Sequence, residues 1–218
     1  MKLYGALISP FVRKVAVIAT EKGISFELGR GGPGSDDAEF LAASPLGKIP
    51  AIDDDGFKLA DSSAIAIYLD AKHPEPRLIP EDPQARGKAV FYDEFADTVL
   101  GAAGLKILFN RLVGPKLLKV GGDEALALQG EAELPRWTDW FESVVPESGW
   151  LLGDVFTIAD ISVASTFRTL AYVRHGVDAA ARPRTAAWFE RVAARPSWAA
   201  VAAQEDVFAQ RIMAMANA

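Results

Sequence analysis

Cysteine is absent from this chain of 218 residues. Its absence excludes disulfide bonds, thiolate metal sites and every cysteine nucleophile, so any thiol chemistry must come from a ligand. Only two histidines are present, His73 and His175, and they lie far apart in the sequence. Both fall near the ends of expected helices, where histidine commonly serves as a C-terminal cap. We therefore expect neither a metal site nor a catalytic triad built on histidine.

Long hydrophobic runs and clusters of basic residues are also missing. No apolar stretch approaches the roughly 18 uncharged residues of a transmembrane helix, so we expect no membrane span. The first residues lead directly into an expected strand and lack the layout of a signal peptide, which makes the cytoplasm the expected compartment. The net charge is −6 and the isoelectric point is near 5.0. The sequence therefore lacks the basic patch that is typical of nucleic-acid-binding proteins.

The order of expected elements changes in the middle of the chain. Residues 1–75 alternate strands and helices in the order βαβ-α-ββα, beginning with a unit of the kind that builds parallel sheets. Four prolines within residues 74–83 stop helices and stiffen a connector, so we place a linker at 76–83. Residues 84–218 carry apolar residues at helical spacing, which predicts an all-helical second domain.

Breaks in the second domain set the expected helix ends. The first long helix is expected over 84–113, where Gly114-Pro115 interrupts it, and the second over 123–145. Thr157 followed by Asp160 resembles a capping box at the start of a central helix, so we interpret Asp160 as structural rather than catalytic. The expected C-terminal elements are two short helices, Thr185–Ala194 and Pro196–Ala203, and a helical tail from about Glu205.

The stretch around Ile49-Pro50 combines a loop, a proline and the start of a short apolar strand. Proline at the first residue of a strand costs no ladder hydrogen bond. Asp55-Gly56 then supplies the positive φ values of a tight hairpin turn. Asp61-Ser62-Ser63 precedes an apolar run and marks a helix N-terminus, whose unpaired N–H groups favour a carboxylate or phosphate. The residues alone leave open a simpler interpretation, in which Asp61-Ser62 only caps a helix and Lys48 only solvates a loop.

Three motifs together resemble those of the cytosolic glutathione transferase family. They are Leu3-Tyr4-Gly5 with Ser9-Pro10-Phe11 and Arg13-Lys14-Val15, then Gly47-Lys48-Ile49-Pro50, then Asp61-Ser62. They occur in the family's order and spacing, and the resemblance covers both halves of the chain. It implies a thioredoxin-like N-terminal domain, an all-helical C-terminal domain, a cis Ile49–Pro50 bond and a homodimer.

The resemblance implies glutathione as co-substrate, and each part of this tripeptide needs a different partner. Ile49, next to Pro50, is expected to pair its main-chain N–H and C=O with the cysteinyl unit, as an added strand would. The hydroxyl of Ser62 and the amides of the helix start suit the γ-glutamyl carboxylate, whereas Asp61 suits the γ-glutamyl ammonium. Lys48 supplies positive charge to the glycyl end or to a peptide carbonyl.

Ser9 is the candidate that activates the glutathione sulfur. It opens the first helix as its N-cap, with Pro10 at the first helical position. A hydroxyl donor aimed at the sulfur stabilises the thiolate, whereas an alcohol is too weakly acidic or basic to serve as a general base. The run from Ser9 to Val15 matches serine-type branches of the family. Tyr4 is the rival donor, because some branches use an N-terminal tyrosine, and a plain N-cap role for Ser9 remains open.

The electrophile is expected to bind between the domains, beside the first long helix of the second domain. The aromatic candidates for this site are Phe11, Tyr92, Phe95 and Phe109. Aromatics at helical spacing are usually core residues, so this set rests on position alone. The leading hypothesis is conjugation of glutathione to small hydrophobic electrophiles. Its alternatives are glutathione-dependent isomerisation or peroxide reduction, and a non-catalytic interaction module with the same fold.

Overall fold

The computed structural model describes residues 1–216, with the side chains of residues 1–210. Its first part contains a four-stranded sheet and three helices, in the expected order βαβ-α-ββα. The elements are β1 (Lys2–Tyr4), α1 (Pro10–Glu21), β2 (Glu27–Gly29), α2 (Ala38–Ala43), β3 (Ala51–Asp54), β4 (Phe57–Ala60) and α3 (Ser62–Lys72).

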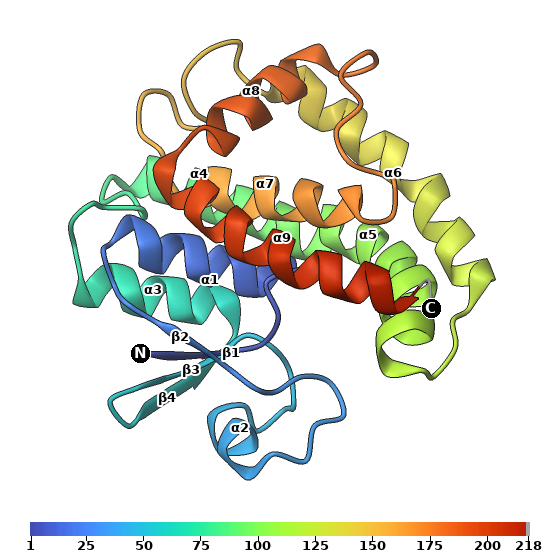
Figure 1. The fold of residues 1–218 in the computed structure, drawn as a ribbon. Helices are drawn as coiled ribbons and strands as arrows, with labels where there is room; N and C mark the ends of the chain where they lie inside the picture. The colour runs from blue at the N-terminus through green and yellow to red at the C-terminus, as the bar shows by residue number, and fades with distance from the viewer. Residues whose placement is uncertain (217–218) are drawn as a thin grey trace.

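The sheet has the strand order β2-β1-β3-β4, with β1 parallel to β2 and the other two pairs antiparallel. Asp55 and Gly56 take the positive φ values expected of the hairpin between β3 and β4. Helices α1 and α3 lie on one side of the sheet and α2 lies on the other (Figure 1). The sheet therefore has helices on both faces, and the end of β1 and the start of β3 lie at the edge that carries the loops described below.

The second part is helical. Its elements are α4 (Pro83–Glu94), η1 (Phe95–Leu100), α5 (Gly101–Leu108), η2 (Phe109–Leu118), α6 (Glu124–Val144), α7 (Ile158–Ala171), α8 (Pro183–Ala193) and α9 (Pro196–Ala216). The segments η1 and η2 are π-helical turns that join α4, α5 and their continuation without a break.

Two expected helix ends were wrong. The first long helix does not stop at Gly114-Pro115 but runs to Leu118, because Pro115 lies in a π-helical segment and Lys119 ends the helix with a φ of 57°. The expected break near Glu205 does not occur, and α9 is continuous from Pro196. Nothing in the Ala203-Gln204-Glu205 run disfavours a helix, and Glu205 is turned into the interior.

Helix α1 occupies the centre of the molecule, packed against α7, α3 and α9. Its apolar stripe, including Val12, Val15 and Ile18, is buried and belongs to one hydrophobic core shared by both parts of the chain. The linker is held by charge as well as by packing. The Lys22 ammonium pairs with Asp70 at 2.7 Å and donates hydrogen bonds to the carbonyls of His73 and Pro76.

The start of α7 confirms the structural interpretation of Asp160. Thr157 and Asp160 form a capping box, and the buried Asp160 carboxylate also accepts hydrogen bonds from the Leu151 N–H and the Trp188 indole N–H, both at 2.9 Å. His73 lies at the C-cap of α3, as expected. Within residues 1–216, no helix is both long and apolar enough to cross a membrane.

Candidate active site

The residues expected to bind glutathione line one cavity of about 360 Å³. It is formed by the loop before β3, the start of α3 and the first turn of α1. The expected residues on its wall are Lys48, Ile49, Pro50, Asp61, Ser62 and Phe11. The structure therefore brings together residues that lie more than 50 positions apart in the sequence.

The loop before β3 is held in place by Ser44. The Ser44 hydroxyl donates to the Lys48 carbonyl at 2.6 Å and accepts from the Lys48 N–H at 3.0 Å. Gly47 completes the turn with a φ of 64°, which glycine adopts without steric cost. The Ile49–Pro50 bond is cis, as the resemblance implies. Neither the N–H nor the C=O of Ile49 hydrogen bonds to any described residue, so both are available on the cavity wall.

At the start of α3, some hydrogen-bond donors bond within the protein and others are left for the cavity. Asp61 is the N-cap, and its Oδ1 accepts hydrogen bonds from the Ser63 and Ala64 N–H groups at 3.0 and 2.9 Å. The capping interpretation is therefore correct for this oxygen. The Ser62 hydroxyl and N–H have no partner among the described residues. These two donors, at the positive end of the helix, give the cavity an anion-binding corner.

Ser9 is the N-cap of α1 by position, but its hydroxyl makes no capping hydrogen bond. The hydroxyl is half-buried and has no partner among the described residues. Ser9 itself is not among the residues that line the cavity, whereas Phe11 is. The Ser9 N–H donates to the Ala6 carbonyl at 2.9 Å, which fixes the turn between β1 and α1. The structure thus leaves the Ser9 hydroxyl unused by the helix that it starts.

Tyr4 lies elsewhere. Its ring is 1% exposed and packs against Phe40 of α2, with the ring centroids 6.0 Å apart. This is the sheet face covered by α2, and Tyr4 does not line the cavity that contains Lys48. Burial raises the pKa of its hydroxyl above the ordinary value. Tyr4 is therefore a core residue, which favours Ser9 as the hydroxyl donor.

Comparison with known proteins agrees with this geometry. Residues 3–77 match the family model of the glutathione S-transferase N-terminal domain, and residues 100–196 match that of the C-terminal domain. The chain is 33% identical to glutathione S-transferase 3 of Zea mays, over 91% of each chain. It is 30% identical to a glutathione S-transferase of Hyoscyamus muticus, over 91% of this chain and 95% of the relative. The chain belongs to the glutathione S-transferase family.

The solved structures of relatives extend this result. A structure of glutathione S-transferase-I bound to lactoylglutathione superimposes with a TM-score of 0.79 at 27% identity, covering 93% of this chain and 98% of that one. The expected architecture, a thioredoxin-like domain followed by a helical domain, is therefore confirmed. Relatives with the transferase name over most of the chain favour the enzyme over a non-catalytic module.

In this member of the glutathione S-transferase family, sequence reasoning missed an acidic residue on the cavity wall. Asp97 of η1 lines the cavity, and its Oδ2 pairs with the buried Lys14 ammonium at 2.6 Å. Lys14 also pairs with Asp93 at 2.6 Å, and Asp93 accepts hydrogen bonds from the hydroxyls of Ser63 and Ser162. Burial, together with the Asp93 charge, outweighs Lys14 and raises the pKa of Asp97 to about 6.

A second buried network anchors the residue before Ser9. The Ile8 carbonyl accepts a hydrogen bond from Thr169 of α7 at 2.9 Å and another from the Arg13 guanidinium at 3.4 Å. Arg13 is itself paired with the fully buried Glu205 of α9. Arg13 therefore holds the Ser9 turn from inside the protein.

The four aromatic candidates for the electrophile site do not meet in one cavity. Phe11 lines the cavity with Lys48. Tyr92 and Phe95 pack around Trp140 of α6, with centroid distances of 6.4 and 4.7 Å, beside a separate surface cavity. Phe109 is 42% exposed at the start of η2. The sequence could not tell which of these aromatics line a cavity and which lie in the core, because both kinds occur at the same helical spacing.

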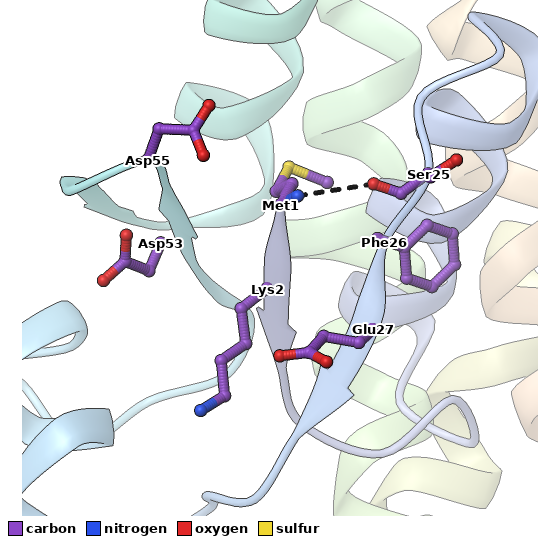
Figure 2. Close-up of a pocket in the computed structure, with 7 residues that line it drawn as sticks. All are labelled: Met1, Lys2, Ser25, Phe26, Glu27, Asp53 and Asp55. Carbon is purple, nitrogen blue, oxygen red and sulfur yellow. Dashed lines mark hydrogen bonds between the residues drawn. The ribbon is translucent and has the colours of Figure 1, made fainter.

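A further cavity lies at the opposite end of β1 (Figure 2). Its walls carry the N-terminal ammonium, which donates to the Ser25 carbonyl at 3.4 Å, and the carboxylates of Glu27, Asp53 and Asp55. None of the expected site residues lines this cavity.

Proposed function

We propose that this protein is a glutathione transferase that conjugates the glutathione thiolate to small hydrophobic electrophiles. The observation that supports this most is the single cavity lined by the exposed Lys48, by Ile49 with its unpaired N–H and C=O, and by Asp61 and Ser62 at the start of α3. Each of these groups complements one part of glutathione. A fold that had lost the ligand would have no reason to keep these groups together on one cavity wall.

The cavity offers a separate partner to each end of the tripeptide. The free N–H and C=O of Ile49 pair with the cysteinyl unit in the manner of an added strand. The Ser62 hydroxyl and N–H bind the γ-glutamyl carboxylate at the helix start. Asp61 uses Oδ1 for capping and leaves Oδ2 for the γ-glutamyl ammonium. The exposed Lys48 ammonium has no described partner and faces the glycyl carboxylate.

The reaction requires the glutathione sulfur as an anion. A free thiol has a pKa of about 8.5, so only a few per cent is ionised at neutral pH. Lowering that pKa by about two units requires about 2.7 kcal/mol of preference for the thiolate. A hydroxyl donor and the amides of a helix N-terminus together supply an effect of this size. Ser9 provides the unused hydroxyl, and the first turn of α1, which begins just after Ser9, provides the amides.

Conjugation then follows directly. The thiolate attacks an electrophilic carbon, a carbon–sulfur bond forms, and the leaving group departs with its electron pair. Phe11 is the aromatic candidate that lines the cavity and packs against the apolar part of the electrophile. The domains proposed for this enzyme are a glutathione-binding domain, 1–75, a linker, 76–83, and a helical domain, 84–218, that contributes the electrophile site.

The proposed enzyme is a cytoplasmic homodimer. The face around α3 supports this, because Phe57 is 47% exposed and Ile67 is 58% exposed on one side of the sheet domain. Burying the 61–68 region of one protomer against the helical domain of its partner would remove this apolar surface from water.

The test combines binding and turnover. The protein is expected to be retained on immobilised glutathione, to gain thermal stability from millimolar glutathione, and to turn over 1-chloro-2,4-dinitrobenzene. Ser9→Ala is expected to lower turnover by orders of magnitude with an unchanged circular dichroism spectrum. Tyr4→Phe, the matched removal of the rival hydroxyl, is expected to leave turnover within a few-fold of wild type. An inactive Tyr4→Phe beside an active Ser9→Ala would overturn the assignment, and failure to bind glutathione would overturn the function.

A further inference from the structure

The peptide group between Ile8 and Ser9 is held at both ends. Its N–H, which belongs to Ser9, donates to the Ala6 carbonyl at 2.9 Å. Its C=O, which belongs to Ile8, accepts a hydrogen bond from the Thr169 hydroxyl at 2.9 Å. Because a peptide group is planar, fixing both ends fixes the orientation of the whole group and the position of the Ser9 Cα attached to it. Thr169 therefore makes one of the two contacts that orient the start of Ser9.

The contact between Thr169 and Ile8 is buried where α1 packs against α7 (Figure 1). Thr169 and Ile8 are 3% and 6% exposed, so the carbonyl lies away from bulk water. The second donor to the Ile8 carbonyl, Arg13 Nη2, lies 3.4 Å away and makes a much weaker hydrogen bond. Without the Thr169 hydroxyl, the Ile8 carbonyl would keep only this long hydrogen bond.

The Thr169 hydroxyl does not use the partner that is usual for a threonine inside a helix. Such hydroxyls commonly donate to the carbonyl four residues earlier, which here belongs to Ser165. The Ser165 carbonyl instead accepts Arg13 Nη1 at 2.5 Å, and Nη1 also donates to the Thr169 oxygen at 2.9 Å. Because a guanidinium can only donate, Thr169 accepts from Arg13 and turns its own proton to Ile8.

Helix α9 fixes the guanidinium from the other side. Arg13 Nε donates to Glu205 Oε2 at 2.7 Å, and Nη2 pairs with Oε1 at 2.5 Å. Since the guanidinium is planar and rigid, holding Nε and Nη2 leaves Nη1 directed at α7. A continuous series of contacts thus runs from Glu205 through Arg13 and Thr169 to the peptide group that carries Ser9.

We propose that Thr169 is a positioning residue for Ser9, whose hydroxyl it keeps directed at the glutathione sulfur. The inference rests on the proposed function and adds to it a residue of the helical domain that acts through the Ser9 turn. Thr169 is not among the residues that line the cavity with Lys48. Because a hydrogen bond weakens steeply as its angle departs from linear, a small rotation of Ser9 reduces its stabilisation of the thiolate.

Thr169→Val tests this role, because it removes the hydroxyl and keeps the branched shape. Titration of the thiolate ultraviolet absorbance in the enzyme–glutathione complex is expected to show a thiol pKa raised by about 0.5 to 1, less than in Ser9→Ala. Since only the thiolate reacts, kcat/KM for 1-chloro-2,4-dinitrobenzene is expected to fall about threefold to tenfold at about pH 5.5 and to equal wild type at about pH 8.5. KM for glutathione is expected to stay within about twofold, because the groups proposed to bind its ends are unchanged.

Thr169→Ser is the rescue variant, and Thr166→Val is the matched control. Thr169→Ser keeps the hydroxyl and is expected to keep the wild-type thiol pKa. Thr166 lies about one turn earlier in α7 and is also 3% exposed. Its hydroxyl donates to the Ala96 and Ser162 carbonyls at 3.4 and 3.3 Å, and not to Ile8. Thr166→Val is therefore expected to leave the thiol pKa unchanged, whatever it does to the melting temperature.

The outcomes separate the inference from the proposed function. If the thiol pKa of the Thr169→Val complex stays within about 0.2 of wild type, Thr169 only holds α7 against α1, so the inference is wrong and the proposed function stands. The inference is equally wrong if Thr166→Val raises the thiol pKa as much as Thr169→Val does. If the wild type neither binds glutathione nor turns over 1-chloro-2,4-dinitrobenzene, the proposed function fails and the inference fails with it.

Discussion

Removing the Glu205 carboxylate is expected to be among the most damaging single changes to the stability of this protein. Glu205 and Arg13 are 0% and 1% exposed, and they pair through two hydrogen bonds, Nε–Oε2 at 2.7 Å and Nη2–Oε1 at 2.5 Å. Glu205 also accepts hydrogen bonds from Arg168 and Tyr172. Glu205→Leu leaves the Arg13 charge buried without a counter-ion, which costs about 3–5 kcal/mol.

Urea unfolding measures this loss. If the free energy of unfolding falls by about 3 kcal/mol per molar urea, a loss of about 4 kcal/mol in stability lowers the urea midpoint by more than about 1 M. Tryptophan fluorescence reports the transition, at one fixed protein concentration because dimer formation would make stability depend on concentration. Asp206→Asn is the control: Asp206 pairs with Arg168 at the exposed edge of the same network, so its loss is expected to stay below about 1 kcal/mol.

A double variant separates the charge from the packing. Arg13→Met combined with Glu205→Leu removes both charges, so its loss is expected to be clearly smaller than the sum of the two single losses. If Glu205→Leu stays within about 1 kcal/mol of wild type, or if the two losses simply add, the buried pair does not stabilise the packing of α9 on α1.

The contribution of Glu205 to the stability of the protein depends on pH in a defined direction. Burial by itself raises the pKa of Glu205, but hydrogen bonds and charge from Arg13, Tyr172 and Arg168 outweigh it and hold the pKa below 4.5. A carboxylate whose folded pKa is lowered stabilises the protein above its unfolded pKa, and that stabilisation is lost as the pH falls through the folded pKa. The difference between wild type and Glu205→Gln is therefore expected to shrink below about pH 4.

Two other predictions follow from single positions. Burial raises the pKa of Asp97 to about 6, so the folded state binds more protons than the unfolded state between about pH 4 and pH 6. The free energy of unfolding therefore falls as the pH rises through this window. Asp97→Asn is expected to flatten that part of the pH profile of unfolding, and an unchanged profile would contradict the assignment. Gly29→Ala, whose Cβ would lie 2.7 Å from the Tyr4 ring, is expected to cost about 1–3 kcal/mol in urea unfolding, whereas Gly32→Ala, with no atom within 4 Å of its Cβ, serves as the neutral control.

Local chemistry made much of the sheet domain predictable. Ser9-Pro10, Asp55-Gly56 and Asp61-Ser62 each favour one backbone geometry for reasons confined to a few residues, so their helix starts and turn were found correctly. The helix break expected at Gly114-Pro115 was wrong, because a π-helical segment accommodates that proline. The helix continues there to Leu118 despite the local preference of Gly114-Pro115 for a break.

The sequence by itself determined the order of elements, the family motifs and the exclusion of cysteine chemistry, because each depends on residue type and short spacing. Only the tertiary structure decided that Tyr4 is a core residue and that Asp97 lines the same cavity as Lys48. Those outcomes depend on which side chains from distant segments meet. Burial and charge pairing between such segments are set by packing, which no local pattern encodes.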